Sequence, residues 1–557
     1  MLIIAEEHAM SRSYAVSMQD MGGGVNDYSR PDLIGMSETP NTARNIRGEA
    51  ESFKPRKGYV EFADEIASTT VVALGTYNRF LESNDAMVMV TAEKKLYTIK
   101  PQTDTTWTEI PLGGLLNDVT TVDFSGYGDW LFIFNGADKP ILVDDTTVTQ
   151  PFTKPASIAA VADFKPAFGE VYNGSLFVAG VPSAPNVVFI SKTASSATPE
   201  DIYDFSGALT GFGNADEMKF PDRITAIKQF STSLVIFTTK EAYFVSGTVA
   251  IGATVTYDPQ PIPGAGGAVT QDTVTVVEND LYYLTPQKEV RSLKKSLANS
   301  SSILTTAIST KIQRFIDDTM DNDLESSFSY YDEPNKLYKL YLREAGGVHN
   351  SYRIVADIEK VNDAGVPPFY IDDRMTFSTG IYFKTDGLQQ SYIGSPVVGQ
   401  VYADEMGLSD NGVSIPTARS TKVFNGGNPT TQKNYREVVI FGEKTDGTEI
   451  TVTVYIDNIV VAVEVIDDND FDNGASVLDA GIGTEGIGLF TIGSEGDDDI
   501  TEDGLLKDFV KRITFRQKGK NIRVTFATNE INQNYRIRHM DYVYIPVSRN
   551  YNPIIEK

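Results

Sequence analysis

Residues 231–247 read STSLVIFTTKEAYFVSG, two short apolar runs joined by a polar turn. The runs are rich in Val, Ile, Phe and Tyr, which favour the pleated and partly buried environment of a β-strand. Each run is four to six residues long and is bounded by Ser, Thr, Lys and Gly, as in a hairpin. This stretch therefore predicts two antiparallel strands, and its recurrence along the chain indicates the fold.

The same pattern recurs from about residue 85 onward, for example in GDWLFIFNGADKPILVDD (128–145) and ENDLYYLTPQKEVRSL (278–293). The equivalent points are separated by 43, 46, 58, 47, 56 and 55 residues; they are Met87, Trp130, Leu176, Leu234, Leu281, Leu337 and Tyr392. Periods of about 40–50 residues with several short strands are typical of β-propellers. We expect an all-β chain with an irregular propeller of six or seven blades over residues 61–400. Unrelated hairpins in two sandwiches are the alternative.

One segment has a helical pattern instead. Residues 300–320, SSSILTTAISTKIQRFIDDTM, place apolar side chains three or four positions apart after serines that can cap a helix. The apolar positions are Leu304, Ile308, Ile312, Phe315 and Ile316. We predict an amphipathic helix inserted in the propeller near residues 300–320, with its apolar side packed on the blades.

The pattern changes near residue 401, where a polar, turn-rich stretch separates the repeats from a second β-rich region. Its runs, such as YREVVIFGE and TEITVTVYIDNIVVAVEVI, alternate polar and apolar residues or are β-branched throughout. Residues 401–557 are therefore predicted to form a C-terminal β-sandwich with long acidic loops between Asp467 and Asp503.

Composition excludes several classes of protein. Cysteine is absent, so disulfides, thiolate nucleophiles and cysteine-based zinc sites are impossible. The three histidines, His8, His349 and His539, have no local spacing that suggests a metal site. The first residues meet Glu6 and Glu7 too early for a secretory signal, and no apolar run is long enough to span a membrane. We expect no contact with a membrane.

Charge argues against a protein that grips DNA. The chain has 75 acidic and 48 basic residues, a net charge of −27. Such a surface repels nucleic acid within about 10 Å, the Debye length at moderate salt. The same acidity is compatible with a protein that DNA must pass without sticking, and also with a charge that serves solubility alone.

Motifs give catalysis no positive support, and we expect neither an enzyme nor a cofactor. The glycines Gly481, Gly483 and Gly486 match G-x-G-x-x-G but lack the flanking strand and helix of a dinucleotide site. Asp468, Asp470 and Asp472 match a calcium loop only in part, because the glycine falls at Gly474. Whether the acidic loops bind cations stays open. The alternative is a host-surface carbohydrate-binding or glycosidase-type tail protein built on a propeller, although the sialidase Asp box is missing.

The first part of the chain adds a resemblance. Residues 22–62 read GGGVNDYSRPDLIGMSETPNTARNIRGEAESFKPRKGYVEF, and their order resembles the N-termini of tail nozzle proteins of short-tailed bacteriophages, also called tail tubular or stabilisation proteins. The matching residues are Gly23, Gly24, Asn26, Pro31, Asp32, Ile34, Glu38, Pro40, Ala43, Arg44, Asn45, Arg56, Gly58 and Tyr59. Later segments are similar to the family's propeller blades and to its C-terminal β-rich part; the acidic insertions at 467–503 depart from it.

The resemblance implies a structural protein of the virion tail. It implies a homo-oligomer, a hexameric ring below the portal and adaptor, in the head–tail connector complex. Such a ring forms and gates the DNA ejection channel, and genome DNA passes through it without specific binding. An adjoining tail adaptor ring and other tail proteins would be its partners.

The turn-rich segment 1–60 is basic in places, and we predict that it extends from the subunit and contacts a neighbouring ring. An ordinary first loop leading into the propeller is the alternative. The residues predicted to contact the partner are Arg44, Asn45, Arg47, Lys54, Arg56 and Lys57. Deleting residues 1–48 should then spare the propeller. We also expect a net negative wall along the ring axis, with constrictions made by loops.

Overall fold

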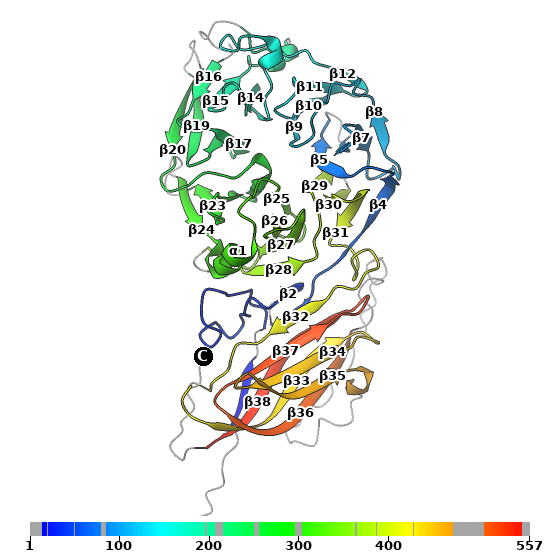
Figure 1. Cartoon of the computed structure of the whole chain (residues 1–557), viewed down its shortest axis with the longest axis vertical. Coiled ribbons are helices and arrows are strands. Elements are labelled where there is room, and N and C mark those ends of the chain that lie inside the picture. Colours follow the sequence, from blue (N-terminus) through cyan, green and yellow to red (C-terminus); the bar gives the residue numbers. More distant parts are fainter. Residues whose placement is uncertain are drawn as a thin grey trace, which may run out of the picture. The chain divides into compact units, whose positions relative to one another are not determined.

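The computed structural model divides the chain into two compact units (Figure 1). One spans Val60–Asp404; the other combines the chain up to Tyr59 with the chain from Glu405 onward. The structure describes residues 14–18, 21–49, 51–79, 85–194, 198–206, 216–249, 255–295, 303–362, 365–385, 387–426, 428–471 and 506–547. Within these ranges, no helix has the length and apolar character that crossing a membrane would require.

The Val60–Asp404 unit is a β-propeller of seven four-stranded sheets, which fixes the predicted six or seven blades at seven. Six sheets each use four consecutive strands. They are β5 (Val71–Tyr77), β6 (Ala86–Thr91), β7 (Leu96–Ile99) and β8 (Thr108–Ile110); β9 (Asp123–Tyr127), β10 (Trp130–Phe134), β11 (Ile141–Asp144) and β12 (Thr147–Thr149); β13 (Phe168–Tyr172), β14 (Ser175–Ala179), β15 (Val187–Ile190) and β16 (Asp216–Lys219); β17 (Ile224–Phe230), β18 (Ser233–Thr238), β19 (Ala242–Val249) and β20 (Val255–Pro261); β21 (Val274–Val277), β22 (Asp280–Leu284), β23 (Val290–Lys295) and β24 (Ile303–Ala307); β25 (Phe328–Asp332), β26 (Leu337–Arg343), β27 (Asn350–Asp357) and β28 (Phe369–Asp373).

The seventh blade closes the ring with a strand from the far end of the unit. It joins β29 (Thr379–Thr385), β30 (Leu388–Gly394) and β31 (Gly399–Asp404) to β4 (Tyr59–Ile66), in that order. The first strands of successive blades are in contact all the way round, from β5 through β9, β13, β17, β21, β25 and β29 back to β5. Figure 1 shows these blades following one another around a centre. The propeller is therefore closed without a free gap.

The second strand of each blade explains the sequence repeat. All seven of the predicted equivalent points lie on these strands, which are β6, β10, β14, β18, β22, β26 and β30. Both faces of a second strand are covered by adjacent blades, so its residues are apolar without alternation; β18, for example, is buried throughout. Apolar clusters lie between neighbouring blades, such as the one that includes Phe132, Leu176 and Phe189.

The predicted helix over residues 300–320 is wrong in its first half. Residues 303–307 form β24, the outer strand of the fifth blade, paired with β23. Only η5 (Ser309–Ile312) and α1 (Gln313–Thr319) are helical. Tertiary pairing overrides the local pattern here, because a blade needs its fourth strand. The later apolar positions Ile308, Ile312, Phe315 and Ile316 are buried as predicted.

Three short 3-10 helices also lie in the propeller, η2 (Val161–Asp163), η3 (Pro199–Tyr203) and η4 (Gln271–Thr273).

The other unit is the predicted β-sandwich, built from two sheets. The larger has the order β2-β3-β38-β33-β36, with β1 also paired to β38; the smaller has the order β32-β37-β34-β35. Their bounds are β1 (Tyr14–Met18), β2 (Ile46–Gly48), β3 (Phe53–Pro55), β32 (Thr417–Ser420), β33 (Lys433–Lys444), β34 (Ile450–Ile456), β35 (Ile459–Ile466), β36 (Lys507–Gly519), β37 (Ile522–Thr528) and β38 (Tyr535–Pro546). Strands β34 and β37 bury every second residue, as a sheet with one covered face must.

The N-terminal segment is not the separate, extended region that the sequence predicts for residues 1–60. Strands β1, β2 and β3 belong to the larger sheet of the sandwich. Phe53 packs on Phe526 of the opposite sheet, with 5.5 Å between ring centroids. Six of the segment's apolar side chains are almost wholly buried; they are Met18, Met21, Val25, Ile34, Ile46 and Phe53. Few apolar residues suffice here because the second half of the chain provides the rest of the core.

Candidate functional site

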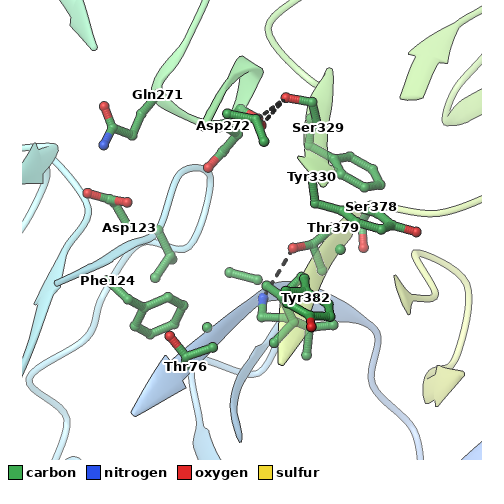
Figure 2. Close-up of a pocket in the computed structure, with 18 of the residues that line it drawn as sticks. Thr76, Asp123, Phe124, Gln271, Asp272, Ser329, Tyr330, Ser378, Thr379 and Tyr382 are labelled. Carbon is green, nitrogen blue, oxygen red and sulfur yellow. Dashed lines mark hydrogen bonds between the residues drawn. The ribbon is translucent and has the colours of Figure 1, made fainter. Parts of the chain in front are cut away.

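The propeller has a cavity along its axis, lined by first strands of the blades and by the loops beside them (Figure 2). It encloses about 1170 Å³. Strands β5, β9, β21, β25 and β29 contribute to the wall, together with Lys228 from β17, two residues of η4 and the loops that adjoin these strands. First strands carry fewer large apolar residues than second strands, because their inner side meets the cavity rather than another blade.

Glycines allow the first strands to approach one another at the axis. A Cβ on Gly75 of β5 would lie 2.4 Å from the Phe124 ring of β9, and a Cβ on Gly380 of β29 would lie 2.6 Å from the Tyr330 ring of β25. Aromatic rings thus fill the space that side chains at these glycines would need. The width of the cavity depends on this packing.

Carboxylates gather at one side of the cavity, around a single lysine. Lys228 Nζ lies 3.6 Å from Glu170 Oε2, and the Glu170 carboxylate raises the pKa of Lys228. Asp123 accepts a hydrogen bond from the Gly169 amide at 3.0 Å. Surrounding protein raises the pKa of Asp123 to about 8 and that of Asp272 to about 6, since burial disfavours a charged carboxylate. Figure 2 shows Asp123, Gln271 and Asp272 on the same side.

Hydroxyl and amide groups complete the polar wall. Ser329 Oγ donates to the Asp272 carbonyl oxygen at 3.3 Å, and Thr275 and Ser329 hydroxyls are 2.7 Å apart. Gln271 is fixed by two hydrogen bonds to the Ile227 backbone, 2.8 Å and 3.0 Å long. Across the cavity, Thr379 accepts a hydrogen bond from the Leu74 amide (Figure 2). These groups are held in place by the blades, so the wall is rigid and polar.

The charge of the wall is negative. Four carboxylates line the cavity against three cationic side chains, in addition to Asp123, whose raised pKa favours its neutral form; the carboxylates are Asp272, Glu278, Glu325 and Glu333, and the cations are Arg79, Lys228 and Lys336. Lys336 pairs with Glu278 at 3.2 Å, and Arg79 with Asp145 at 2.8 Å. A cavity of this size and polarity can accept a small polar or cationic molecule. The sequence repeat does not indicate this site, because the repeat marks the apolar second strands. The polar residues of the cavity lie on first strands and loops, and they follow no regular pattern in the sequence.

Half of the residues predicted to contact a partner are buried inside the sandwich unit. Arg56 forms a two-pronged ion pair with Asp410, at 2.8 Å and 2.6 Å, and donates to Asn45 Oδ1 at 3.0 Å. Asn45 in turn donates to the Pro416 carbonyl at 2.7 Å. Arg47 is buried 3.7 Å from Glu405. These side chains connect the N-terminal segment to residues 405–416 inside the sandwich unit. They are therefore buried and cannot contact a partner.

The other three predicted contact residues are more accessible. Arg44 is half-buried and donates to the carbonyl oxygens of Asn41 and Ala43. Lys54 pairs with Glu49 at 2.6 Å, and Lys57 is exposed. Their proposed role at a partner stays a prediction.

In the described part of the partial calcium motif, the aspartates form ion pairs with lysines. Asp468, in η6 (Asp468–Asp470), pairs with Lys444, and Asp470 pairs with Lys511 at 3.0 Å. Asp472, Gly474 and the glycines at 481, 483 and 486 lie outside the described residues, as does His8. His349 lines the axial cavity, and His539 stacks on Phe441 with centroids 4.1 Å apart. Across the described ranges, no three His, Asp or Glu side chains are grouped as metal ligands.

Comparisons with known proteins show likeness in fold alone. No family model and no curated protein matches the chain. A solved structure of YCF48 bound to D1 peptide is similar at 12% identity with a TM-score of 0.37, covering 66% of this chain and 98% of that one. YCF48 from Cyanidioschyzon merolae gives 9% identity, TM-score 0.37 and coverages of 63% and 98%. The WD40 β-propeller domain of Doa1 is similar at 7% identity with a TM-score of 0.36, covering 63% of this chain and 96% of that one.

Proposed function

We propose that this chain is a structural subunit of a short-tailed phage tail, a nozzle ring below the portal and adaptor through which DNA leaves. The observation that carries the proposal is the order of residues in the segment 22–62, which resembles the start of the nozzle family. The proposal includes a hexameric ring, location in the virion tail and no catalytic activity.

The positions of the matching residues support a structural role for this segment. Arg56, Asn45 and Asp410 connect the N-terminal segment to the chain beyond residue 404. A Cβ on Gly58 would lie 1.9 Å from the Ser409 carbonyl oxygen, so a larger residue would push the two segments apart. Asn26 donates to Glu38 at 2.7 Å. These residues hold the unit together, which is what a building block of an assembly needs.

In this proposal the DNA passes along the axis of the ring that the subunits form, outside each propeller. A net charge of −27 supports an acidic wall along that axis, which would repel phosphates rather than bind them.

Electron microscopy and a DNA-binding assay test the proposal together. Class averages of the purified protein should show sixfold rings with an axial hole, and labelled antibody should mark the tail of virions. Filter binding with a 30-base-pair duplex should detect no complex at physiological salt. A monomeric particle, a label on the capsid, or a salt-sensitive DNA complex would each contradict the proposed function.

The axial cavity supports a second candidate function, a carbohydrate-binding or glycosidase-type tail protein. The supporting observation is Asp123, whose pKa near 8 keeps it protonated at neutral pH within a wall of other carboxylates. A protonated acid near an ionised carboxylate is the pair that glycosidases use. Release of reducing ends from host polysaccharide, lost in Asp123→Asn and in Asp272→Asn, would favour this function. Absence of both sugar binding and release in the native protein would reject it.

A further inference from the structure

We propose that copies of this chain join head to tail, with the loop formed by residues 26–38 of one copy resting on β35 of the next. This contact rests on one part of the proposed function, namely that copies of the chain form a ring. The two surfaces are unrelated in sequence, and both belong to the sandwich unit.

The loop of residues 26–38 is closed and internally braced. Its ends meet where Asn26 donates its amide to the Thr39 carbonyl at 2.8 Å and Thr39 donates to Gly24 at 3.1 Å. Glu38 accepts hydrogen bonds from both the Asn26 side chain and the Gly35 amide, each at 2.7 Å. A Cβ on Gly23 would lie 2.6 Å from the Ser37 backbone, so glycine is needed at the base. Such a compact loop with adjacent ends is an Ω-loop, a frequent functional element.

The loop presents large side chains to solvent despite this bracing. Tyr28 is 76% exposed and Leu33 is 67% exposed, while Ile34 beside them is buried and anchors the loop. Arg30 lies between them and forms an exposed pair with Asp32 at 3.1 Å. Tyr and Arg are the residue types that most often carry binding energy at interfaces, and a rigid loop loses little entropy on docking. The Ω-loop therefore has the properties of a projecting contact.

Strand β35 contacts β36 and buries Ile466, but it leaves four apolar side chains exposed to solvent. Among the described residues its hydrogen-bonded partner is β34 alone, so it is an edge strand of the smaller sheet. Ile459 is 66% exposed and Val463 is 57% exposed, and Val460 and Val465 are exposed as well. Val460, Val463 and Val465 face the same side as Tyr455, Thr453 and Thr451 of β34. Proteins normally protect such edges with charges or proline, and β35 contains Glu464 as its single charged residue.

The two surfaces lie at opposite edges of one sheet. The Ω-loop is attached at the β32 edge, where Thr39 Oγ1 donates to the Ser420 carbonyl at 2.8 Å and Arg419 donates to the Ser37 carbonyl at 2.7 Å. Strand β35 is the other edge, three strand spacings or about 14 Å away. In Figure 1 the loop, in blue, lies beside β32, with β37 and β34 between it and β35.

This placement favours a second copy as the occupant of β35. A head-to-tail contact needs two different complementary patches on each subunit, one projecting and one receiving, and it closes into a ring when the rotation allows. A two-fold contact needs one patch that matches itself. Because the chain carries a net charge of −27, copies repel one another, and an apolar contact is needed to hold them together.

Two point variants and their mixture test the contact. Leu33→Asp removes the projecting surface and Val463→Asp the receiving one; Val397→Asp is the matched control, since Val397 is 61% exposed in the propeller. Sedimentation velocity should show rings for the native protein and the control. Each of the other two variants alone should be monomeric, with subunit affinity weakened at least about 30-fold. All four proteins should have similar thermal unfolding.

The equimolar mixture gives the sharpest result. Leu33→Asp keeps an intact β35 and Val463→Asp keeps an intact loop, so the mixture should form one-to-one dimers and no ring. A mixture that stays monomeric, or rings that persist in either variant, would overturn the contact and leave the proposed function standing. A native protein that is monomeric at about 100 μM would overturn both. Native rings that lose assembly as expected but are absent from virion tails would overturn the function alone.

Discussion

Lys339 Nζ lies 2.7 Å from Asp404 Oδ2, and both side chains are fully buried. Asp404 ends β31 of the seventh blade, whereas Lys339 is in β26 of the sixth. Arg353 contacts the same carboxylate at 2.8 Å, and the Tyr330 hydroxyl donates to it at 2.6 Å. This ionic cluster joins the sixth blade to β31, the strand of the seventh blade that pairs with β4.

Replacing Asp404 should strongly destabilise the propeller. Asp404→Asn leaves Lys339 and Arg353 with fewer compensating charges in a dry environment, and losing one member of a buried pair typically costs about 3–5 kcal/mol. Chemical denaturation followed by tryptophan fluorescence measures the change. Asp222→Asn is the control, because the Lys240–Asp222 pair is exposed to solvent and should contribute little to stability. Equal effects of the two substitutions would contradict the role of the cluster.

The same cluster should make the propeller sensitive to acid. Burial alone would raise the pKa of Asp404, but Arg353 and Lys339 hold it well below its usual range. A carboxyl group with a lowered pKa contributes stability above its unfolded pKa of about 4, and the contribution disappears as the pH falls further. The difference in unfolding free energy between the native protein and Asp404→Asn should therefore shrink below about pH 4. A constant difference from pH 3 to pH 7 would disprove the linkage.

Asp123 should have the opposite pH dependence. Its pKa is raised to about 8, chiefly by burial, so the folded state favours the protonated form. That contribution is complete below about pH 4 and is lost as the pH rises to about 8. Asp123→Asn is neutral at every pH and keeps an acceptor for the Gly169 amide. Its melting temperature relative to the native protein should rise between pH 5 and pH 8, as scanning calorimetry can measure; a flat difference would refute the prediction.

Arg56 and Lys57 are adjacent residues with opposite expected effects. Arg56→Ala leaves Asp410 and Asn45 buried without their partner, and should destabilise the sandwich unit by about 3–5 kcal/mol. Lys57 is exposed, so Lys57→Ala should change stability by less than about 0.5 kcal/mol. Urea titration of both variants gives the comparison. Similar midpoints would show that the Arg56–Asp410 pair adds little.

Deleting residues 1–48 should separate the two units thermally. The deletion removes β1, β2 and the buried side chains Met18 and Ile34 from the sandwich, but leaves β4 and the whole of Val60–Asp404. Calorimetry should show the propeller transition near its original temperature and the sandwich transition lost or lowered. Two unchanged transitions would mean that the N-terminal segment adds little to the stability of the sandwich unit.

The propeller could be predicted from the sequence because its signal is local. Leu234 and Leu281 lie on second strands covered on both sides, and each such strand gives a continuous apolar run at blade spacing. The helix prediction for residues 300–320 was partly wrong because it, too, used only local spacing. Leu304 and Ile308 have helical spacing, but pairing with β23 places Leu304 in a strand.

The remaining features depend on contacts between distant parts of the chain. Nothing near Tyr59 indicates that it begins a strand that completes a blade ending at Asp404. Arg56 lies in a basic stretch of the kind that is usually exposed. Its burial is explained by its ion pair with Asp410, which is distant in the sequence. The cavity wall draws Asp123, Asp272 and Ser329 from three separate blade connections and strands, so no spacing in the sequence connects them.

The closure of the seventh blade also imposes an order of events during synthesis. Strand β4 leaves the ribosome about 330 residues before β31, which at about 5–20 residues per second means a wait of roughly 15–70 seconds. The intervening six blades can form as each hairpin pair emerges, but the ring cannot seal in that time. Until β31 emerges, the nascent chain carries β4 unpaired at one end of an open crescent, and chaperones or early proteolysis would act on this intermediate rather than on the finished protein.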